Sequence, residues 1–568
     1  MANPNFPNNP GYNLYVGARY IPMFSKHNDG VWDINHAYEP LEIVLYGGNS
    51  YTSKTFIPAG IELTNKTYWA LTGNYNAQYE QLNQNYVSLV EDFNELKSYF
   101  SYVTPQMYGA KGDGVNDDTN AINLAIADVN NGVNVLFFPA GNYLISTTLN
   151  TINNNGCVIR GAGNGDSTII MNGTTGYMLS VTGSNTIIEN LTFTNKVTPT
   201  AGGAITAYTT FGLKVRNCYC SNVFNFVKLG RNDAGGSIWT VIEQIIGSCL
   251  GAFIDVYGGY NGIHVLDCQI NSEFVNTNSC AMKFPTTESL DTVYMDNCLF
   301  QRMGHGLILE PTTQNVVIQN LFITNTVFDA MVNESVLIRL GQNATATRLH
   351  FNGCWFTSRD GNAITVDLTN NGVLSGVLFD GCDFNTIAKH AYYQIGVNSA
   401  KVSISDCNIS AYNKNNSALY AGIKMPDGAV LFSITNNTIG NIPGSANTCQ
   451  TAVEVGDNCA YYIVSGNIVY NNTGEKIKHG TNNMNGKIID NVGYRAQVDS
   501  IPAVPASGVR YTHNFPYPAT YYVYSGNVSM INLNGGRVPT TGASFVMNPG
   551  DWVEITYTGT LAWYVNFD

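Results

Sequence analysis

A short pattern of apolar and polar positions recurs from about residue 157 to residue 494. Each copy reads apolar, any, apolar, any, then Asn, Gly or Asp, then a small residue or Cys, any, apolar. Alternation of this kind is typical of a strand with one buried face. The copies lie 23 to 33 residues apart, which predicts a solenoid in which every repeat adds one rung of parallel sheet. The clearest copies are 213–220, 263–270, 293–300, 349–356, 377–384 and 402–409.

The sixth position of the repeat is interpreted as an inward-facing column of small side chains, in which thiols behave as small hydrophobic groups. The 12 cysteines include no CxxC pair and no Cys/His spacing of a metal site. The sequence therefore predicts reduced thiols, no metal and no other cofactor. The sixth position is expected to hold Leu191, Cys218, Ile245, Cys268, Cys298, Leu321, Cys354, Cys382, Cys407, Asn437, Asn467 and Val492.

A second column carries charge. About twenty residues before each sixth position, a short strand places one outward residue between two inward ones. The signs alternate along most of this column, and adjacent strands lie ~4.8 Å apart, so we interpret it as a charge ladder that fixes strand register. Its members are expected to be Lys228, Asp255, Lys283, Glu310, Arg339, Asp367, Gln394, Lys424 and Glu454.

The segment from Tyr108 to Tyr143 differs from the repeats. It reads as a tight turn, a short helix with apolar faces, a buried strand at 133–138 and a second turn at 139–141. Three carboxylates, those of Asp113, Asp117 and Asp118, are expected to serve the first turn and the helix N-terminus. A metal or acid–base cluster is the alternative for these three residues.

This segment contains, in order, YGAKGDG, DDT, FFPAG and NY. The order resembles the opening of pectate-lyase-like parallel β-helices, which pectin-active enzymes share with many bacteriophage tailspikes. The resemblance implies an all-β fold, a right-handed parallel β-helix over residues 103–498, with the helix covering its open end. It also implies a homotrimeric tail appendage that meets a host cell-surface polysaccharide.

Two segments precede the solenoid. Residues 1–72 form a small module with a predicted hairpin at 42–56. The module resembles the N-terminal attachment modules of phage tail appendages and, more loosely, chitin-binding-type modules, so Tyr68 and Trp69 suit either its core or a sugar ring. Residues 73–102 carry a heptad seam, which favours a parallel three-stranded coiled coil over a single helix lying on the solenoid. The seam is Tyr75, Tyr79, Leu82, Tyr86, Leu89, Phe93, Leu96 and Phe100.

Residues 499–568 follow the solenoid. Prolines interrupt the repeat there, and two stretches typical of antiparallel hairpins come after them. We expect a C-terminal β domain that protects the last open edge of the solenoid.

Composition limits the partners. Only 12% of the 568 residues are charged, and the net charge is −13 without a Lys/Arg-rich run, which argues against nucleic acid. The chain shows no apolar run of membrane-spanning length and no signal-peptide pattern. We therefore expect a protein that is made in the host cytoplasm, does not insert into a membrane, and works in the tail of a virion, attached to other tail or collar proteins by its N-terminal module.

Cleavage of a glycosidic bond by hydrolysis needs two carboxylates on either side of it. The residue two places before the sixth position supplies Glu243 and Asp296, which we take as candidate catalytic residues. They are two rungs or about 9.6 Å apart, near the upper limit for an inverting hydrolase. An ion pair of Glu243 with Arg216 is the structural alternative, and other acids to consider are Asp329, Glu334 and Glu288. Candidate substrate-binding residues are His264, Tyr294, His350, Trp355 and Arg216.

These residues belong to two outward columns of one sheet. The column two places before the sixth position is expected to include Gln319, and the column four places before it Val317. The first column is expected to run Glu189, Arg216, Glu243, Leu266, Asp296, Gln319, Asn352 and Asp380, and the second Lys214, Val241, His264, Tyr294, Val317 and His350.

Three functions fit this organisation. The first is a tailspike that binds a capsular, exopolysaccharide or teichoic-acid-type polymer and depolymerises it, as a glycoside hydrolase rather than a lyase. The second is a spike that binds the same glycan without cleaving it. The third is a bacterial polysaccharide lyase or hydrolase outside a virion. The N-terminal, helical and C-terminal accessories favour the first two.

Overall fold

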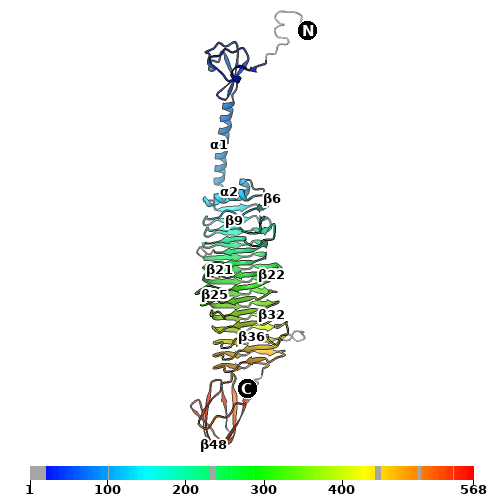
Figure 1. Ribbon diagram of the computed structural model, residues 1–568, viewed down its shortest axis with the longest axis vertical. Helices are drawn as coiled ribbons and strands as arrows, with labels where there is room; N and C mark the ends of the chain where they lie inside the picture. Colours follow the sequence, from blue (N-terminus) through cyan, green and yellow to red (C-terminus); the bar gives the residue numbers. More distant parts are fainter. Residues whose placement is uncertain are drawn as a thin grey trace. The chain divides into compact units, whose positions relative to one another are not determined.

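The computed structural model describes residues 21–99, 102–208, 210–230, 238–257, 259–285, 287–441, 449–494, 501–540 and 543–567. The chain divides into two compact units, Met1–Ser101 and Tyr102–Asp568. Strands build the solenoid, a small N-terminal sheet and a C-terminal domain, which confirms the predicted all-β parallel β-helix (Figure 1). Within the described residues the two α-helices are α1 (Tyr75–Tyr99) and α2 (Thr119–Asn130).

The first unit contains a small sheet and helix α1. The predicted hairpin is present, because β2 and β3 pair antiparallel and are joined by Gly47 and Gly48. Trp69 is 2% exposed and packs edge-on against Tyr38, so it serves the core of the module. The predicted module also includes residues 1–20, which lie outside the described residues. The strands, in sheet order, are β1 (Met23–Phe24), β2 (Glu42–Tyr46), β3 (Asn49–Ser53) and β4 (Trp69–Gly73).

Helix α1 carries the predicted heptad seam on its surface. The seam side chains from Tyr75 to Phe93 are all exposed, while those of Leu96 and Phe100 lie outside the described part of the chain. An apolar stripe of this length on a single helix is what the partners in a coiled coil bury. The assembly of α1 into a three-stranded coiled coil stays a prediction.

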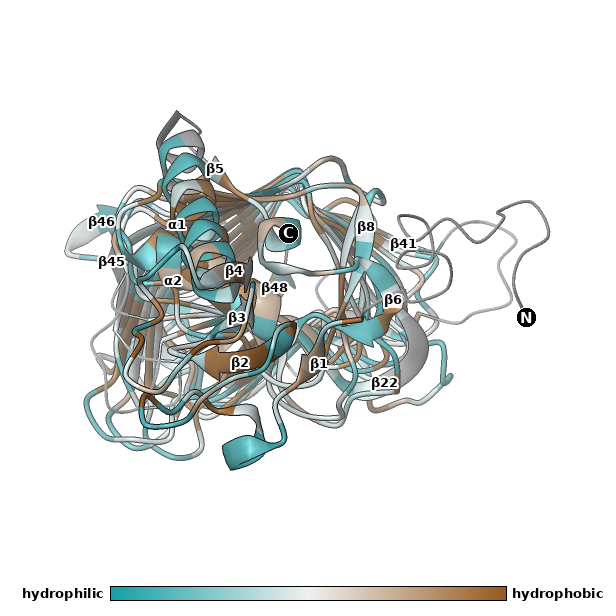
Figure 2. Cartoon of the chain, turned by 90° about the horizontal axis from the view of Figure 1, so that it is seen from above, coloured by the Kyte–Doolittle hydropathy of each residue, from teal (hydrophilic) through white to brown (hydrophobic). Residues whose placement is uncertain are grey.

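The second unit is built around a solenoid of three stacked parallel faces, and Figure 2 looks down the stack so that successive rungs overlie one another. Each rung contributes one strand to each face, and β22 and β24 are long enough to serve two faces. Sheet 1 comprises β5 (Tyr102–Val103), β7 (Val135–Phe138), β9 (Val158–Gly161), β12 (Ile187–Glu189), β15 (Lys214–Arg216), β18 (Ile238–Glu243), β21 (Tyr260–Leu266), β23 (Leu290–Asp296), β25 (Val317–Thr324), β28 (Thr345–Asn352), β31 (Val373–Asp380), β34 (Ser399–Ser405), β37 (Phe432–Thr435), β40 (Ile463–Ser465) and β43 (Lys487–Ile489).

The other two faces follow sheet 1 along each rung. Sheet 2 comprises β6 (Asp113–Asp117), β8 (Gly141–Ile145), β10 (Ser167–Met171), β13 (Thr192–Asn195), β16 (Tyr219–Val223), β19 (Ile246–Cys249), β22 (Gln269–Lys283), β24 (Leu299–Leu309), β26 (Val327–Asp329), β29 (Trp355–Ser358), β32 (Asp383–Ile387), β35 (Asn408–Ser410), β38 (Thr438–Gly440) and β41 (Ile468–Tyr470). Sheet 3 comprises the second halves of β22 and β24 with β11 (Tyr177–Val181), β14 (Gly203–Ala207), β17 (Asn225–Leu229), β20 (Ala252–Val256), β27 (Val336–Arg339), β30 (Ile364–Asp367), β33 (Tyr392–Ile395), β36 (Ala421–Met425), β39 (Thr451–Val455) and β42 (Ile477–His479).

The chain turns from sheet 1 to sheet 2 through one residue with positive φ. This residue is the fifth position of the repeat, and Asn, Asp and Gly adopt the left-handed region at lower cost than other residues. The preference for these residues at that position is therefore a requirement of the backbone. This turn column is Asn190, Asn217, Gln244, Asp267, Asn297, Asn325, Gly353, Gly381, Asp406, Asn436, Gly466 and Asp490.

The interior of the solenoid is a stack of apolar side chains. The rings of Phe300, Phe328, Phe356 and Phe384 follow one another with centroids 5.8, 5.6 and 5.0 Å apart. All 12 cysteines are buried and free, as predicted for reduced thiols. The interior thus uses the same side chain on successive rungs, which keeps the rungs in register.

The predicted sixth-position column is wrong at two rungs. Asp296 pairs in register with Thr324, so the residue after Cys298 in the column is buried Thr326 and not Leu321. At the last rung the column holds Asn491 and not Val492, because Asn467 bonds to the Asn491 side chain. In both cases a nearby apolar residue fits the pattern of the repeat better than the polar residue that occupies the column.

Both ends of the solenoid are covered. Helix α2 lies across the first end (Figure 1), and its Ile122, Ile126 and Val129 are buried in the same core cluster as the first rungs. At the other end Tyr517 is buried in that cluster, and its hydroxyl lies 2.5 Å from His479 Nε2. The predicted covering of the open end by a helix is therefore confirmed.

The three aspartates near α2 hold the turn together. Asp118 Oδ1 and Oδ2 accept hydrogen bonds from the backbone N–H groups of Lys111 and Gly112, at 2.7 and 3.0 Å. Asp113 Oδ1 accepts two backbone N–H groups, and Asp117 Oδ1 accepts the N–H of Thr119. Asp118 precedes α2 but makes no side-chain cap to it, so its predicted capping role is wrong and its predicted turn role is right.

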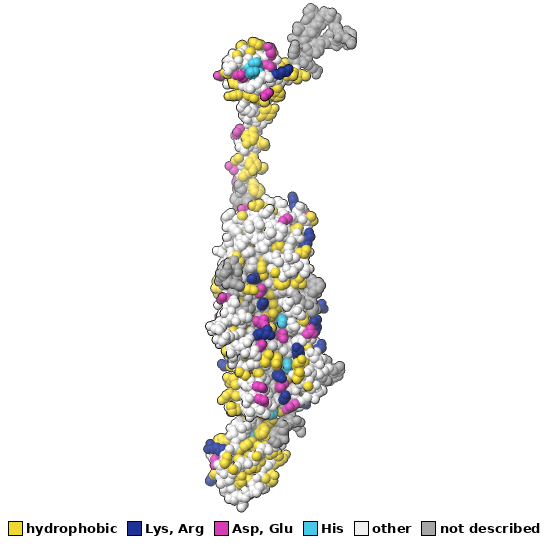
Figure 3. Space-filling view, viewed as in Figure 1, with side chains coloured by type: hydrophobic (Ala, Val, Ile, Leu, Met, Phe, Trp, Pro, Cys, Tyr) yellow, Lys and Arg dark blue, Asp and Glu magenta, His cyan; other side chains and the backbone are white. Residues whose placement is uncertain are grey.

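The predicted charge ladder exists, but it is broken into three pieces. Lys228, Asp255 and Lys283 lie in register, yet Lys283 stands opposite Ile308. The next charged residues therefore form a separate column, in which Arg339 contacts Glu310 at 2.5 Å and Asp367 at 3.3 Å. Figure 3 shows this alternation of basic and acidic side chains on the face that it presents.

The lower part of the ladder also departs from the prediction. Gln394 is 1% exposed and donates to Ser399 Oγ at 2.6 Å, so it points into the core and is not a member. The ladder resumes on the following rungs, where Glu454 contacts Lys424 at 3.2 Å and Lys478 at 3.3 Å. Exposed pairs of this kind contribute at most about 1 kcal/mol each.

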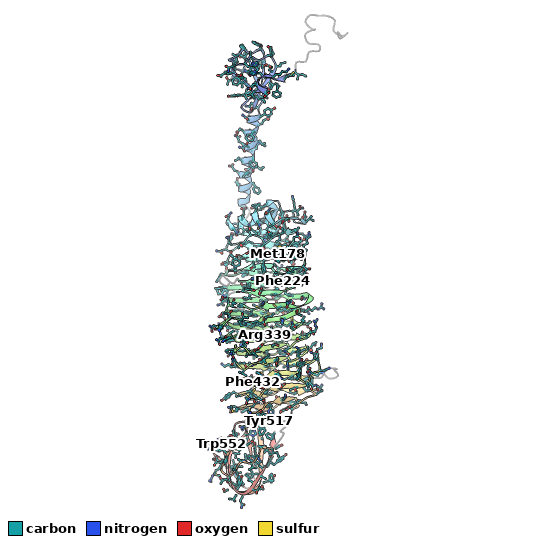
Figure 4. All side chains as sticks on the ribbon, viewed as in Figure 1. Met178, Phe224, Arg339, Phe432, Tyr517 and Trp552 are labelled. Carbon is teal, nitrogen blue, oxygen red and sulfur yellow. The ribbon has the colours of Figure 1, made fainter. Side chains whose placement is uncertain are left out.

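A separate antiparallel sheet follows the solenoid, as predicted for the C-terminal β domain. Its core contains Trp563, whose indole N–H donates to Pro502 O at 2.8 Å. Trp552 lies at the surface of the sheet, with the guanidinium of Arg510 3.9 Å from its ring (Figure 4 labels Trp552). The strands are β44 (Arg510–Thr512), β45 (Ala519–Leu533), β46 (Gly536–Val538), β47 (Ser544–Met547) and β48 (Trp552–Phe567).

Candidate functional site

The outer face of sheet 1 carries most of the candidate residues in two parallel columns. Pairing in register places Glu243 beside Leu266, Leu266 beside Asp296, and Asp296 beside Thr324. The predicted member Gln319 is thus wrong, and Thr324 takes its place. Over these rungs the column is Glu189, Arg216, Glu243, Leu266, Asp296, Thr324, Asn352 and Asp380.

The second column is an aromatic ladder, the name used below for His264, Tyr294, Phe322 and His350. The ring centroids are 4.9 Å apart between His264 and Tyr294, 5.2 Å between Tyr294 and Phe322, and 5.4 Å between Phe322 and His350. Tyr294 is 41% exposed and the other three are half-buried. Four successive strands place these rings over about 14 Å of sheet surface. Phe322 stands where the sequence predicted Val317.

The two candidate carboxylates lie at different rungs beside this ladder. Leu266 separates Glu243 from Asp296, which puts their Cα atoms about 9.6 Å apart along the stack. Asp296 Oδ1 accepts hydrogen bonds from Thr324 Oγ1 at 2.5 Å and from Asn325 Nδ2 at 3.1 Å. These contacts fix the orientation of the Asp296 carboxylate.

Arg216 belongs to the same column but points its charge to the preceding rung. Its Nε donates to Glu189 Oε2 at 2.8 Å. The structure therefore places Arg216 two strands from His264 and pairs it with Glu189.

A polar network borders the aromatic ladder on its other side. Asp291 accepts hydrogen bonds from Asn320 Nδ2 at 2.6 Å and Gln319 Nε2 at 3.1 Å. Arg348 in turn donates to Gln319 Oε1 at 2.9 Å and to Asn320 Oδ1 at 2.5 Å. The hydrogen bond from Asn320 holds the pKa of Asp291 below its ordinary value, so this carboxylate is ionised at neutral pH. Sequence reasoning missed this network.

Trp355 lies on a different face from the aromatic ladder. It is 45% exposed on β29 of sheet 2, two residues beyond Gly353, whose φ of 61° turns the chain away from sheet 1. In register it neighbours Val327 and Asp383. The structure thus brings together His264, Tyr294 and His350 but not Trp355.

A depression of about 750 Å³ lies on sheet 3. Arg339 lines it together with Lys283 and Glu310, and Figure 4 labels Arg339 on the face shown. Because Arg339 is already paired with Glu310 and Asp367, its charge is largely balanced. Loop residues with amide and hydroxyl groups complete the wall: Thr312, Gln342, Thr369, Asn370 and Asn371.

The acids that the sequence proposed as alternatives do not share one site. Glu334 lies in the loop before β27, where its carboxylate is 3.7 Å from His305 Nδ1. Burial lowers the pKa of His305 to about 4, so this histidine is neutral at pH 7. Asp329 accepts a hydrogen bond from Gln301 on sheet 2, and Glu288 is exposed in the loop before β23.

Two further kinds of feature, a metal-binding cluster and a membrane-spanning helix, are absent from the described ranges. These ranges hold no group of three or more His, Cys, Asp or Glu side chains placed to bind a metal ion. They also hold no helix that is both long and apolar enough to cross a membrane.

Comparison with known proteins agrees with the fold. Residues 103–211 match the family model described as Rhamnogalacturonase A/epimerase, pectate lyase-like. The protein is therefore a parallel β-helix protein whose solenoid opens with a pectate-lyase-like segment.

Two solved phage structures can be compared over most of the chain. Tailspike protein 3 of bacteriophage CBA120 gives a TM-score of 0.51 at 13% identity, over 85% of this chain and 82% of that chain. A tailspike of E. coli bacteriophage HK620, in complex with a pentasaccharide, gives 0.47 at 11% identity, over 82% and 92%. The chain has the fold of phage tailspike proteins with a parallel β-helix.

A third similarity is short. A protein of Penicillium expansum described as non-secreted LysM effector LysM19 is 54% identical over 52 residues, which is 7% of this chain. The chain spans only 4% of the length of that relative.

Proposed function

We propose that the protein is a phage tail appendage that binds a host cell-surface polysaccharide along the outer face of sheet 1. The aromatic ladder carries this proposal, because four neighbouring rings, of which Tyr294 is the most exposed, lie in a row beside ordered amides, carboxylates and an arginine. Aromatic faces bind the apolar faces of sugar rings, and neighbouring polar groups bind the hydroxyls. The similarity to tailspike structures supports a place in the virion tail.

Binding can be tested directly. Replacing Tyr294 by Ala removes the most exposed ring of the ladder, and we expect the affinity for the glycan to fall about tenfold, or ~1.4 kcal/mol. Tyr219→Ala is the matched control, because Tyr219 is 36% exposed on sheet 2. A microarray of bacterial surface polysaccharides first identifies a polysaccharide that the protein binds. Isothermal titration with this polysaccharide then measures the affinity of both variants. Equal affinities of the two variants would refute the ladder as the binding face.

Hydrolysis of the bound glycan is the second function that we propose. Glu243 and Asp296 lie along the same face as the ladder, and general acid–base catalysis needs two such carboxylates. We expect purified protein to release new reducing ends from the polysaccharide, and Glu243→Gln or Asp296→Asn to abolish them. Reducing ends that persist in both variants would show that the catalytic site lies elsewhere. Products that absorb near 235 nm would indicate a lyase. Binding of the polysaccharide without new reducing ends would indicate an adhesin.

The assembly of the spike belongs to the same proposal. The exposed heptad seam of α1 supports a homotrimer, since three such helices bury their seams together. The N-terminal module would attach this trimer to tail or collar proteins of the virion. Sedimentation velocity of the purified protein tests the trimer, and a mass of one chain would refute it.

A further inference from the structure

Sheet 1 contains a second column of left-handed residues, which we call the bend column. Half of its twelve members are Asn or Gly, the residues that adopt this conformation most readily. Trp239 is one of the other six, with φ 57° and 59% of its surface exposed. A bulky residue that is held in a disfavoured conformation and also exposed to water indicates a role beyond the fold. The column is Asn185, Gly212, Trp239, Gly262, Thr292, Asn320, Arg348, Gly376, Lys401, Leu431, Tyr461 and Asn485.

The indole of Trp239 is held in place by its neighbours. The ring of Phe211, itself 41% exposed, lies 5.1 Å away at an angle of 49°. On the next rung stands Gly262, where a Cβ atom would come within 2.7 Å of Trp239 Cδ1. The absence of a side chain at Gly262 therefore leaves room for the indole to lie against the backbone, with its remaining surface toward solvent.

A depression of about 350 Å³ lies beside the strand that carries Trp239, within the ~300–1,000 Å³ range of small-ligand sites. Ile238, which precedes Trp239, lines it, as does Asn261, which pairs in register with Ile238. Asp291 and Gln319 also line it, and the hydrogen bond between them fixes both side chains. The depression thus brings ordered hydrogen-bonding groups to the end of the strand that carries Trp239.

We propose that Trp239 and this depression form a subsite for one uncharged pyranose residue of a polysaccharide. The apolar face of the sugar stacks on the indole, and its hydroxyls bond to Asn261 and Gln319. The ionised carboxylate of Asp291 disfavours an acidic sugar here, because like charges repel. The inference rests on the proposed function and deepens it, since Trp239 lies one rung before His264 on the same sheet, two residues from Val241, which is in register with His264.

The decisive variant is Trp239→Asn, because Asn is a common residue of the bend column and relieves the backbone conformation. We expect this variant to bind the glycan at least tenfold more weakly while its unfolding temperature stays the same or rises. Trp239→Phe keeps a stacking ring and is expected to retain most of the affinity. Tyr461→Asn is the matched control, since Tyr461 stands in the same column with φ 55° and 61% exposure, eight rungs away.

Titration calorimetry with the polysaccharides that the unaltered protein binds on the microarray separates the outcomes. Full affinity of Trp239→Asn together with a loss in Tyr294→Ala overturns the subsite and keeps the proposed function. Binding of polyuronates alone overturns the assignment of an uncharged sugar. If the unaltered protein binds no polysaccharide of the array, the proposed function fails and this inference with it. A loss in Tyr461→Asn equal to that in Trp239→Asn also overturns the subsite.

Discussion

Asn437, Asn467 and Asn491 form a ladder of amide side chains near the C-terminal end of the solenoid, called the amide ladder below, and it gives the sharpest test of the structure. Asn467 is fully buried, and its Oδ1 accepts hydrogen bonds from the backbone N–H and from Nδ2 of Asn437, both at 3.0 Å. Its Nδ2 donates to Ile434 O at 2.9 Å and to Asn491 Oδ1 at 2.8 Å. Asn467→Ala removes all four bonds and leaves the buried Asn437 N–H without this acceptor.

The cost follows from these contacts. One buried N–H without a partner costs roughly 1–3 kcal/mol, and each further bond lost adds about 0.5–1.5 kcal/mol. We expect a loss of local stability of about 3–4 kcal/mol, which makes hydrogen exchange of the Asn437 amide roughly 10²- to 10³-fold faster. Exchange mass spectrometry of peptides covering residues 436–438 measures it.

The matched control, Cys407, lies two rungs before Asn467 in the same column. Cys407 Sγ makes only weak contacts with backbone carbonyls, at 3.1 Å to Ser405 O and 3.6 Å to Phe379 O. Cys407→Ala removes about one methylene equivalent of apolar surface and is expected to cost about 1 kcal/mol. If the Asn437 amide keeps its protection in Asn467→Ala, or if both variants behave alike, the amide ladder does not stabilise this end of the solenoid.

Three shorter predictions concern other parts of the chain. Leu89→Asp places a charge in the exposed seam of α1 and is expected to give a single-chain mass in sedimentation, whereas Gln84→Asp, outside the seam, leaves the assembly intact. Arg339→Met breaks two ion pairs at the surface and is expected to cost at most about 2 kcal/mol, a difference that 1 M NaCl removes from the melting temperature. Burial lowers the pKa of His390 to about 4. The unfolded chain therefore binds a proton at His390 before the folded protein does, and stability is lost as pH falls from about 6.5 toward 4. The melting temperature of His390→Gln should depend less on pH in that window.

The sequence predicts the solenoid well because the backbone imposes its pattern at every rung. Inward residues alternate with outward ones, and the left-handed turn after sheet 1 admits few residue types. The register failed at β25, where Asn320 and Asn325 both precede plausible sixth positions. Asn320 belongs to the bend column and Asn325 to the turn column, and no local pattern distinguishes two left-handed asparagines five residues apart.

The same register error limits what the sequence shows of the site. His264, Tyr294 and His350 come from rungs whose register was right, and the structure places them in one column. Phe322 was missed because the register at β25 was misplaced by five residues. Trp239 has its own signal, a large aromatic residue six positions before Ile245, where half of the rungs carry Gly or Asn, but its importance depends on Phe211 and Gly262 lying beside it.

The spacing of Glu243 and Asp296 makes a final prediction about chemistry. A retaining glycosidase needs its two carboxyl groups about 5–5.5 Å apart, and an inverting one about 6.5–9.5 Å, which leaves space for a water molecule. Two rungs separate this pair by about 9.6 Å at Cα, and Leu266 occupies the rung between them. Moreover, Asp296 is bonded toward Thr324 and Asn325, on the side away from Glu243. If this pair cleaves the glycan, it must therefore do so with inversion. Proton NMR of the first products reports the anomeric configuration, and a product that retains the configuration would exclude Glu243 and Asp296 as the catalytic pair.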